Sequence, residues 1–262
     1  MASIAMGAAV SGAQAQQLRI DTISNNVANV NTNGYKRVDV STADLFYTTL
    51  KRAGILENVD AAPRPVGVQI GMGTKVTGTY RNLQQGQFNN TRRPLDIALT
   101  GVGYFAIALP NGRIGYTRAG AFHRDSTTGN MVDVNGNEFA TNISIGDHNP
   151  QNVQISTDGL VSVQNPNSAQ NTDIGRLEIF TFPNDSGLEA IGGNLLIATS
   201  GSGEAVPVEE TSGRFKQKSL ENSNVSAVEE LTKLIEAQRA YELNTRVIST
   251  QDKILETTNN IK

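Results

Sequence analysis

Both ends of this chain carry a helical repeat, whereas the long stretch between them carries the pattern of β-strands. From about Ser3 to Asn29, one predicted helix face recurs at alternating steps of four and three: Ile4, Ala8, Ser11, Ala15, Leu18, Thr22, Asn25 and Asn29. The same spacing runs from about Val225 to Thr258, with a face of Leu231, Leu234, Gln238, Tyr241, Thr245, Ile248, Asp252 and Leu255. Such steps place residues on one side of an α-helix, so the sequence predicts a helix at each end.

Neither predicted helix face is apolar enough to be stable by itself. The first face consists of small and polar residues, and the second alternates apolar residues with Gln238, Thr245 and Asp252. A helix in a protein gains most of its stability from packing its apolar face. We therefore expect the two helices to pair with each other and then with neighbouring copies of the chain.

Turn and capping residues set the expected ends of the helices. The first helix should stop between Asn29 and Gly34, where the chain reads Asn-Val-Asn-Thr-Asn-Gly, because Asn and Gly favour turns. The second should start near Ser223 or Asn224, since both residue types cap helices well. At ~1.5 Å per residue the second helix would reach roughly 50 Å.

From about Gly67 to Phe215 the apolar residues alternate with a period of two, which is typical of β-strands. The predicted strands are Asp96–Leu99, Tyr104–Leu109, Val153–Ile155, Leu160–Val163, Leu177–Phe182 and Asn194–Ala198. Turn signals separate them: Asn111-Gly112, Asn135-Gly136, Asp158-Gly159 and Ser186-Gly187. The fold class that follows is α+β, with N- and C-terminal helices pairing as a coiled-coil-like unit and an inserted, mostly antiparallel all-β domain.

Composition argues against most kinds of chemical site. The chain has no cysteine and only two histidines, His123 and His148, which do not form a ligand-spaced cluster. A formal net charge of -3 argues against binding to nucleic acid, and no apolar stretch approaches the ~20 residues of a membrane span. Gly101-x-Gly103 lacks the third glycine of a dinucleotide-binding loop. We expect no catalytic, cofactor-binding or metal-binding residues.

Four segments have a distinctive order of residues. Ser24–Arg37 reads SNNVANVNTNGYKR, and near the other end Ser223-Asn224-Val225 precedes Gln238-Arg239-Ala240-Tyr241-Glu242. In the middle lie Gly101-Val102-Gly103-Tyr104-Phe105 and Thr117-Arg118-Ala119-Gly120-Ala121-Phe122. Together these segments resemble the bacterial flagellar rod and hook family, over nearly the full chain. The resemblance and the incomplete helix faces imply subunit contacts through Asn25, Asn26, Asn29, Asn31, Gly34, Tyr35, Leu231, Leu234, Gln238, Arg239, Tyr241 and Ile248.

Within that family the stretch before the β domain resembles the distal rod subclass. In that subclass an extended segment braces neighbouring subunits and stiffens the rod. The residues that would do so here are Asp44, Leu45, Phe46, Tyr47, Pro63 and Pro65. The expected division is a terminal helical domain at 1–38 and 222–262, the bracing segment at 39–70 and the β domain at 71–221.

The resemblance implies a structural subunit and not an enzyme. Such a subunit polymerises into a straight tube that transmits torque and encloses the export channel. Implied partners are further copies, proximal rod proteins, hook protein, the P- and L-ring proteins, and the type III export apparatus. The implied location is the periplasmic part of the basal body, reached without a cleaved signal peptide and without membrane insertion.

Three alternatives stay open at this point. The Ala-rich start Met1–Val10 leaves room for a proximal rod or hook paralogue. A secreted β-rich adhesin or binding protein that oligomerises through its terminal helices would show the same division into helical ends and a β middle. A glycosidase on a β scaffold is a third alternative.

Overall fold

The computed structural model describes residues 2–52, 66–141, 143–164, 171–209 and 213–260. The chain forms two compact units. The helical unit comprises Met1–Val27, Val38–Tyr80 and Ala227–Lys262, and the β unit comprises Ala28–Arg37 and Arg81–Ser226. The division predicted at 1–38 with 222–262, 39–70 and 71–221 stays a prediction, and the boundaries of the two compact units fall at other positions along the chain.

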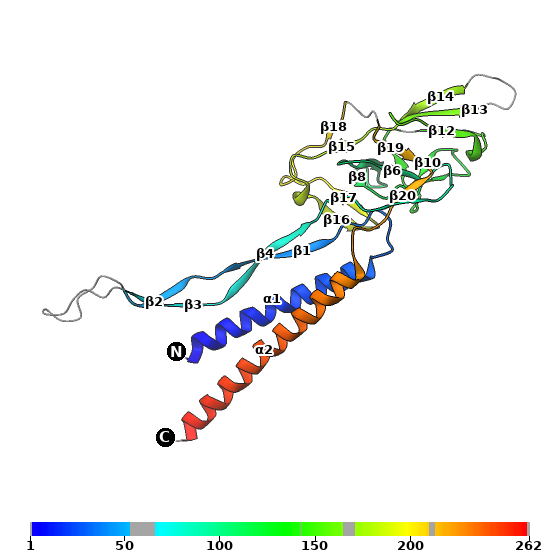
Figure 1. Cartoon of the computed structure of the whole chain (residues 1–262). Helices are drawn as coiled ribbons and strands as arrows, with labels where there is room; N and C mark the ends of the chain where they lie inside the picture. Colours follow the sequence, from blue (N-terminus) through cyan, green and yellow to red (C-terminus); the bar gives the residue numbers. More distant parts are fainter. Residues whose placement is uncertain (1, 53–65, 142, 165–170, 210–212, 261–262) are drawn as a thin grey trace. The chain divides into compact units, whose positions relative to one another are not determined.

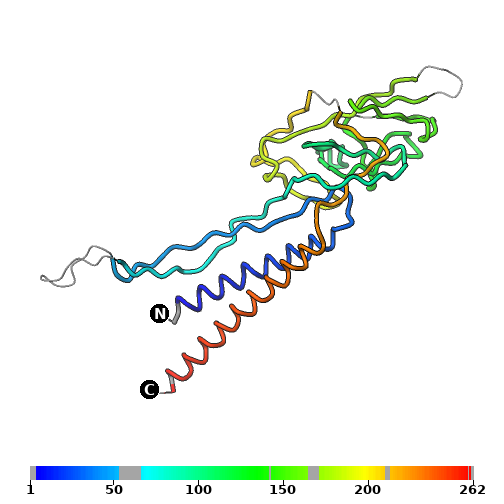
Figure 2. Tube along the Cα trace, in the orientation of Figure 1, coloured from blue at the N-terminus to red at the C-terminus, as the bar shows by residue number. Residues whose placement is uncertain are grey.

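The helical unit contains two long helices that run antiparallel and side by side (Figures 1 and 2). They are α1 (Ala2–Ala28) and α2 (Ala227–Asn260). Asn26 Nδ2 donates a hydrogen bond of 3.0 Å to Glu230 Oε2, and a Cβ atom at Gly12 would lie 3.1 Å from the Asn244 side chain. Close approach at both places confirms the predicted pairing of the ends. No helix in the described part of the chain combines the length and apolarity that crossing a membrane requires.

The start of α2 differs from the prediction. The helix begins at Ala227, a few residues after Ser223 and Asn224. The Asn224 side-chain oxygen, the atom that a helix cap would use, instead accepts a hydrogen bond of 2.8 Å from Arg37 N. The Asn224 amide donates hydrogen bonds of 2.8 and 2.9 Å to the carbonyls of Asn82 and Gln84. Because these contacts occupy the side chain, the sequence pattern places the start of the helix too early.

The buried side of α1 also differs from the predicted face. Ala15 is buried as expected, but Leu18 is 37% exposed and Asn25 is exposed. The buried positions include Ala9, Ala13 and Ile23, which lie beside the predicted face. A second contact explains the difference, because the Ser11 hydroxyl accepts a 3.2 Å hydrogen bond from the amide of Thr74. The helix is therefore covered both by α2 and by the turn that leads into a strand.

Two narrow ribbons complete the helical unit. β1 (Val38–Asp44) pairs with β4 (Thr74–Arg81), and β2 (Tyr47–Lys51) pairs antiparallel with β3 (Val68–Gly71). Each is a two-stranded sheet, and a two-stranded ribbon is marginally stable in water unless something packs on it. Several large apolar side chains on these ribbons are nevertheless exposed: Phe46, Tyr47, Leu50, Val68, Met72 and Tyr80.

The β unit is built from several small sheets in which neighbouring strands run antiparallel. Its largest sheet has seven strands in the order β16 (Glu189–Gly192), β17 (Leu195–Ile197), β8 (Ile114–Thr117), β7 (Phe105–Ala108), β11 (Glu138–Phe139), β10 (Met131–Val132), β9 (His123–Arg124). A second sheet has the order β12 (Val153–Ile155), β13 (Leu160–Gln164), β14 (Asn171–Arg176). Three further pairs are β15 (Phe180–Thr181) with β18 (Val206–Pro207), β19 (Phe215–Gln217) with β6 (Ile97–Leu99), and β20 (Ser219–Glu221) with β5 (Phe88–Asn90).

Most of the strands predicted from alternation are confirmed, with ends that differ by a residue or two. Leu177–Phe182 is the exception, because only Phe180–Thr181 forms a strand. Leu177 and Ile179 are buried as alternation requires. Their backbone groups, however, bond to different segments, with Leu177 donating to Gly159 and Ile179 accepting from Val208. The alternating burial of Leu177 and Ile179 therefore arises without a continuous ladder of hydrogen bonds between two strands.

The core of the β unit is centred on aromatic side chains from separate strands. Phe105 is fully buried and packs edge-to-face on Phe122 and Phe139, with ring centroids 5.1 and 5.9 Å apart. Phe215, near the C-terminal end of the unit, lies 6.4 Å from the same ring. The core is therefore complete only when β19 has added to β6, after almost the whole unit has been synthesised.

A smaller cluster on the other side of β7 joins Tyr104, Tyr116, Phe182 and Leu188. Burial raises the pKa of the Tyr104 hydroxyl, and the nearby Asp185 carboxylate adds to this effect. Burial also raises the pKa of Asp185, against smaller opposing effects of Tyr104 and Arg118. One oxygen of Asp185 is buried and has no hydrogen-bond partner in the described structure.

Replacing Phe105 should destabilise the β unit strongly. Phe105→Ala removes a fully buried ring and leaves a cavity between Phe122 and Phe139, at a cost of about 3–5 kcal/mol. Urea unfolding followed by circular dichroism measures the free energy of unfolding. Val134→Ala, at a side chain that is 69% exposed, is the control and should change it by less than about 0.5 kcal/mol. Equal effects of the two changes would contradict the assignment of the core.

The raised pKa of Asp185 predicts a pH-dependent effect of Asp185→Asn. A carboxyl whose pKa is higher in the folded state favours folding when protonated, so its contribution falls as pH rises through that pKa. The asparagine variant has no carboxyl group, so it does not lose this contribution to stability as pH rises. It should become progressively more stable than the original chain from about pH 4 upward, as measured by thermal unfolding at several pH values. A stability difference that is constant from about pH 4 to 7 would contradict this prediction.

Candidate assembly interface

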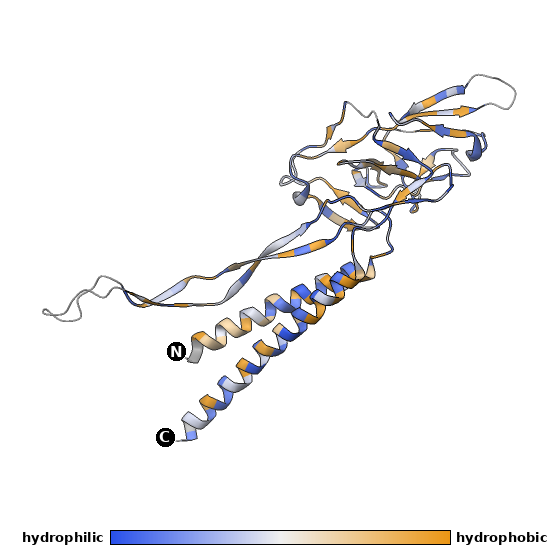
Figure 3. Cartoon of the chain, viewed as in Figure 1, coloured by the Kyte–Doolittle hydropathy of each residue, from blue (hydrophilic) through white to orange (hydrophobic). Residues whose placement is uncertain are grey.

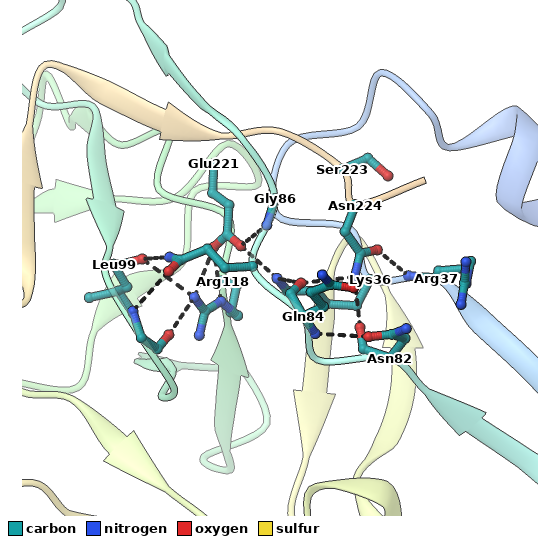
Figure 4. Close-up of polar contacts among 12 residues, drawn as sticks. Lys36, Arg37, Asn82, Gln84, Gly86, Leu99, Arg118, Glu221, Ser223 and Asn224 are labelled. Atoms are coloured by element: carbon teal, nitrogen blue, oxygen red, sulfur yellow. Dashed lines mark hydrogen bonds and ion pairs between the residues drawn. The ribbon is translucent and has the colours of Figure 1, made fainter. Parts of the chain in front are cut away.

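Glu221 is the centre of a buried charge cluster in the β unit (Figure 4). Its side chain is 1% exposed and forms ion pairs with Lys36 and Arg118, which are themselves 5% and 4% exposed. Arg118 donates through Nε at 3.0 Å and Nη2 at 2.9 Å to the same carboxylate oxygen, and Gly86 N donates to the other. We call Lys36, Arg118 and Glu221 the charge clasp.

Arg118 connects the clasp to the glycine-rich segment that precedes β7. Its Nη1 donates to the Gly103 carbonyl at 2.9 Å, and its Nη2 donates to the Gly101 carbonyl at 2.8 Å. The two central motifs, 101–105 and 117–122, are thus joined by one guanidinium group. Charge-assisted bonds of this kind are among the stronger ones in proteins, and here they hold a loop without any strand ladder.

Lys36 connects the clasp to the Asn-rich segment that follows α1. Its ammonium group also donates to the Gln84 carbonyl at 2.8 Å. Burial lowers the pKa of Lys36, and the neighbouring Arg118 charge acts in the same direction, while Glu221 opposes both. Two cations share one carboxylate, so Glu221 is the group on which the buried charge balance depends.

Gly34 shows why the Asn-Gly turn is needed. Its φ angle is +71°, a conformation that glycine adopts at little cost. A Cβ atom there would lie 2.7 Å from the backbone of Arg118 and Ala119, and the Gly34 amide donates to the Glu221 carbonyl at 2.8 Å. The first helix ends at Ala28, one residue before the predicted stretch Asn29–Gly34.

Asn224 bonds to residues that lie close to the points where the chain passes between the two units. Its side-chain oxygen accepts from Arg37 N at 2.8 Å, while its amide donates to the carbonyls of Asn82 and Gln84. Asn82 N in turn donates to the Arg37 carbonyl at 2.8 Å. The chain passes between the units after Val27, after Arg37, before Arg81 and after Ser226. One asparagine therefore links the segments next to three of these four connections.

Asn26 performs a similar role inside the helical unit. Its side chain is buried and bonds Val38 twice, donating to the carbonyl at 2.8 Å and accepting from the amide at 3.0 Å. It also donates to Glu230, a buried carboxylate that accepts from Lys233. A buried polar pair between helices fixes their register, so this contact sets which residues of α1 and α2 lie opposite each other.

The predicted interface residues separate into two groups in this structure. Asn26 is buried, and Gly34, Asn29, Tyr35, Leu234, Tyr241 and Ile248 are half-buried, whereas Asn25, Asn31, Leu231, Gln238 and Arg239 are exposed. Their role between subunits stays a prediction. In the single subunit Leu231 is 48% exposed, while Leu234 is half-buried.

A row of large apolar residues on α2 is unpartnered in the single subunit. Val228 is 76% exposed, Ile235 51%, Leu243 60% and Val247 47%. Figure 3 shows such apolar residues recurring along α2 among hydrophilic ones. The partner α1 covers only part of the helix circumference, so this row meets water in an isolated copy.

The helical unit also contains a groove of about 400 Å³ between α1, α2, β1 and β4. Its lining includes Gln16, Arg19 and Ile23 of α1, Val38 of β1, Tyr80 of β4, and Ala237 of α2. Ile23 and Ala237 are buried apolar residues of the lining. Charges of both signs also line the groove, from Arg19, Asp39, Lys233 and Glu236.

The predicted bracing residues are placed only in part. Phe46 and Tyr47 are 86% and 57% exposed, Asp44 is exposed and Leu45 is half-buried. Pro63 and Pro65 lie outside the described residues. The exposure of Phe46 is notable, since an aromatic ring in water gives up about 1.5–3 kcal/mol that burial would provide.

Sequence reasoning does not find the charge clasp or the role of Asn224. Arg118 lies within one of the distinctive segments, but only the glycines of that segment have a local interpretation. Glu221 has no signal beyond its position before Ser223, and Asn224 has the pattern of a helix cap. Contacts between residues 103 and 185 positions apart leave no periodic pattern, so only folding brings them together.

Removing the Glu221 carboxylate should destabilise the β unit. Glu221→Ala leaves Lys36 and Arg118 as uncompensated buried charges, at a cost of about 3–5 kcal/mol. Glu221→Gln, which keeps the hydrogen-bond acceptor, should lose less, and Glu189→Gln on the exposed strand β16 should lose almost nothing. The free energy of unfolding in urea distinguishes these variants. If Glu221→Ala is no less stable than Glu189→Gln, the clasp is not the main polar tie of the unit.

Comparison with known proteins agrees with these features along the chain. Sequence models of three flagellar families match: "Flagella basal body rod protein" over residues 6–36, "Flagellar hook protein FlgE/F/G D1 domain" over 98–163, and "Flagellar basal body rod FlgEFG protein C-terminal" over 216–261. These stretches contain Asn26, Arg118, Glu221 and Glu230.

Several curated relatives are similar over nearly the whole chain. The flagellar basal-body rod protein FlgG of Borreliella burgdorferi is 42% identical over 262 residues, covering 98% of both chains. FlgG of Caulobacter vibrioides is 43% identical over 261 residues, covering 98% of this chain and 99% of its own. FlgG of Bacillus subtilis is 35% identical over 266 residues and 97% of each chain. With the terminal helices and the β unit both accounted for, this chain belongs to the family of flagellar basal-body rod proteins.

Proposed function

We propose that this chain is a structural subunit of the distal flagellar rod and acts by polymerising. The observation that carries the proposal is the unpartnered apolar row on α2, which includes Val228, Leu243 and Val247. Large exposed apolar surfaces on soluble proteins mark interaction sites. The relatives are named basal-body rod protein FlgG, which supports the proposal that other rod subunits cover this surface.

The chemistry of the row favours an open polymer over a closed dimer. The exposed side of α1 is lined mostly by small or polar residues such as Ala5, Gly7 and Gln14. Its Val10 and Leu18 are each 37% exposed, whereas the apolar side chains of the α2 row are 47–76% exposed. A surface that fits a different surface on the next copy makes a head-to-tail contact, and such contacts generate rings or open helical assemblies. Packed in this way, the helices would form the wall of a tube.

The function of such a tube is mechanical. The subunit would transmit torque as part of a straight drive shaft and enclose an export channel, without catalysis. Its neighbours would be further copies, proximal rod proteins, hook protein and the P- and L-ring proteins. It would reach the periplasm through the type III export apparatus without a cleaved signal peptide. The relatives' names support a place in the basal-body rod, and the exposed bracing residues Asp44, Phe46 and Tyr47 offer surface to neighbouring subunits. The other neighbours and the export route follow from the resemblance to the rod and hook family.

The test is the assembly of the purified full-length chain at increasing concentration. Sedimentation velocity and electron microscopy should show monomers at low concentration and straight tubes at high concentration. Leu243→Glu with Val247→Glu should raise the concentration needed for assembly at least tenfold, because each change places a charge where an apolar contact forms. Val134→Glu, at a similarly exposed position of the β unit, is the matched control.

Two outcomes would contradict the proposal. One is a wild-type chain that stays monomeric at every concentration. The other is a double α2 variant that assembles like the control. Circular dichroism of each variant verifies that the monomer is folded, so a loss of assembly cannot be confused with a loss of structure.

A further inference from the structure

The chain contains three Asn-Gly pairs, Asn33-Gly34, Asn111-Gly112 and Asn135-Gly136. Asparagine is among the chemically less stable residues of proteins. The backbone nitrogen of the next residue can attack the carbonyl carbon of the side-chain amide, Cγ, and glycine hinders this attack least because it has no Cβ atom. All three pairs lie in the β unit, so the surroundings that this unit provides decide which pair can react.

The reaction is deamidation, and its only co-reactant is water. The glycine N–H loses its proton to solvent, and the nitrogen forms a bond to Cγ of the asparagine. The bond from Cγ to the side-chain nitrogen then breaks, and that nitrogen takes a proton from solvent and leaves as ammonia. The product is a cyclic imide, which water opens at either carbonyl to give aspartate or isoaspartate. No group is oxidised or reduced.

Asn33-Gly34 is held in place by the charge clasp. Gly34 N donates to the Glu221 carbonyl at 2.8 Å, and Asn194 Nδ2 donates to the Asn33 carbonyl at 3.1 Å. A Cβ atom at Gly34 would lie 2.7 Å from the backbone of Arg118, so this turn is tightly packed. The attack requires Gly34 N to leave Glu221 and rotate toward Cγ of Asn33, which would disturb the buried clasp.

Asn135-Gly136 is held by the buried Asp133. The Asp133 carboxylate accepts from Asn135 N at 2.7 Å and from Asn135 Nδ2 at 3.4 Å, while the Asp133 carbonyl accepts from Gly136 N at 3.1 Å. The leaving nitrogen and the attacking nitrogen are thus both bonded to one residue. The carboxylate also accepts from Asn137 N at 2.9 Å, so its charge lies close to the peptide groups on both sides of Gly136. That negative charge opposes the loss of a proton from Gly136 N.

Asn111-Gly112 lies at the exposed tip of the hairpin that joins β7 to β8. Gly112 N donates to the Leu109 carbonyl at 3.0 Å, but a Cβ atom at Gly112 would meet nothing within 4 Å among the described residues. Exposed loops open locally at a lower free-energy cost than packed ones. The attacking nitrogen is therefore released more often here than at the other two glycines.

The side-chain bond of Asn111 favours the attack. Its Oδ1 accepts from Arg113 N at 3.0 Å, and negative charge develops on this oxygen when Cγ is attacked. A backbone N–H that points at such an oxygen lowers the barrier to the step. No acidic residue occurs in the sequence from β6 to β9. The neighbouring segment thus has no counterpart of the carboxylate that protects Asn135.

We propose that Asn111 is a site of spontaneous deamidation through an imide with Gly112, and that the fold protects Asn33 and Asn135. The modification adds a negative charge to an exposed turn. In the isoaspartate product the backbone also runs through the former side chain and becomes longer by a carbon atom. This modification does not depend on the proposed polymerisation.

The test follows the full-length chain, kept dilute in mildly alkaline buffer below its unfolding temperature. Samples taken over time are digested, and mass spectrometry measures aspartate and isoaspartate at each of the three asparagines. Asn111 should be converted at least tenfold faster than Asn33 and Asn135, because its turn opens at lower cost. In concentrated urea the three rates should become similar, since the fold no longer separates pairs of the same chemistry.

Two variants test the physical causes. Asn111→Gln should remove the first acidic species seen on isoelectric focusing, because the longer glutamine side chain forms the corresponding imide more slowly, whereas the matched control Asn135→Gln should keep that species. Asp133→Asn should raise the conversion rate at Asn135 several-fold and leave the rate at Asn111 unchanged. Circular dichroism verifies that the Asp133 variant is folded.

Three results would overturn the proposal. The first is equal conversion at the three pairs in the folded chain, and the second is faster conversion at Asn33 or Asn135 than at Asn111. The third is an Asn111 that reacts in urea but not in the folded chain. A folded Asp133→Asn variant in which Asn135 reacts as slowly as before would overturn the protection assigned to that carboxylate.

Discussion

The Glu221 carboxylate is the group on which the polar framework of the β unit depends. It neutralises Lys36 and Arg118 in an environment that is almost fully buried, and Arg118 in turn holds the carbonyls of Gly101 and Gly103. Buried charges are tolerated only when they are paired and hydrogen-bonded. The segment after α1, the loop before β7 and the last strand of the unit therefore share one electrostatic requirement. None of the three can move far without leaving a charge unpaired.

Asn26 and Asn224 bond to backbone groups of other segments, a role that the Asn-rich stretches of the sequence do not predict. Asn26 and Asn224 each satisfy backbone groups of a neighbouring segment at both ends of the amide. An amide side chain offers a donor and an acceptor together, so it can replace a piece of strand ladder where the chain turns. This explains why short connections of the β unit stay ordered although few of them belong to a sheet.

The helical unit has the opposite character, because it leaves apolar surface unburied. The row on α2, the ring of Phe46 and the groove at Ile23 and Ala237 are each incomplete in one copy. A single subunit thus has a buried aromatic core in its β unit, whereas its helical unit leaves rows of apolar side chains exposed. In the proposed polymer the β unit would be stable before assembly, and the helical unit would gain its remaining burial from neighbours.

Local patterns along the chain are enough to predict the class of fold: a helical repeat at both ends, a period of two between them, and turns at Asn-Gly and Asp-Gly dipeptides. They succeed because propensity and periodicity act over a few residues. Three features depend on packing and have no local pattern. Leu231 is exposed while Leu234 is half-buried, and Asn224 bonds to neighbouring segments and does not cap a helix. Lys36, Arg118 and Glu221 come together in one cluster. Each of these depends on contacts between distant segments. Burial and charge pairing are properties of the packed chain, and no repeat in the sequence records them.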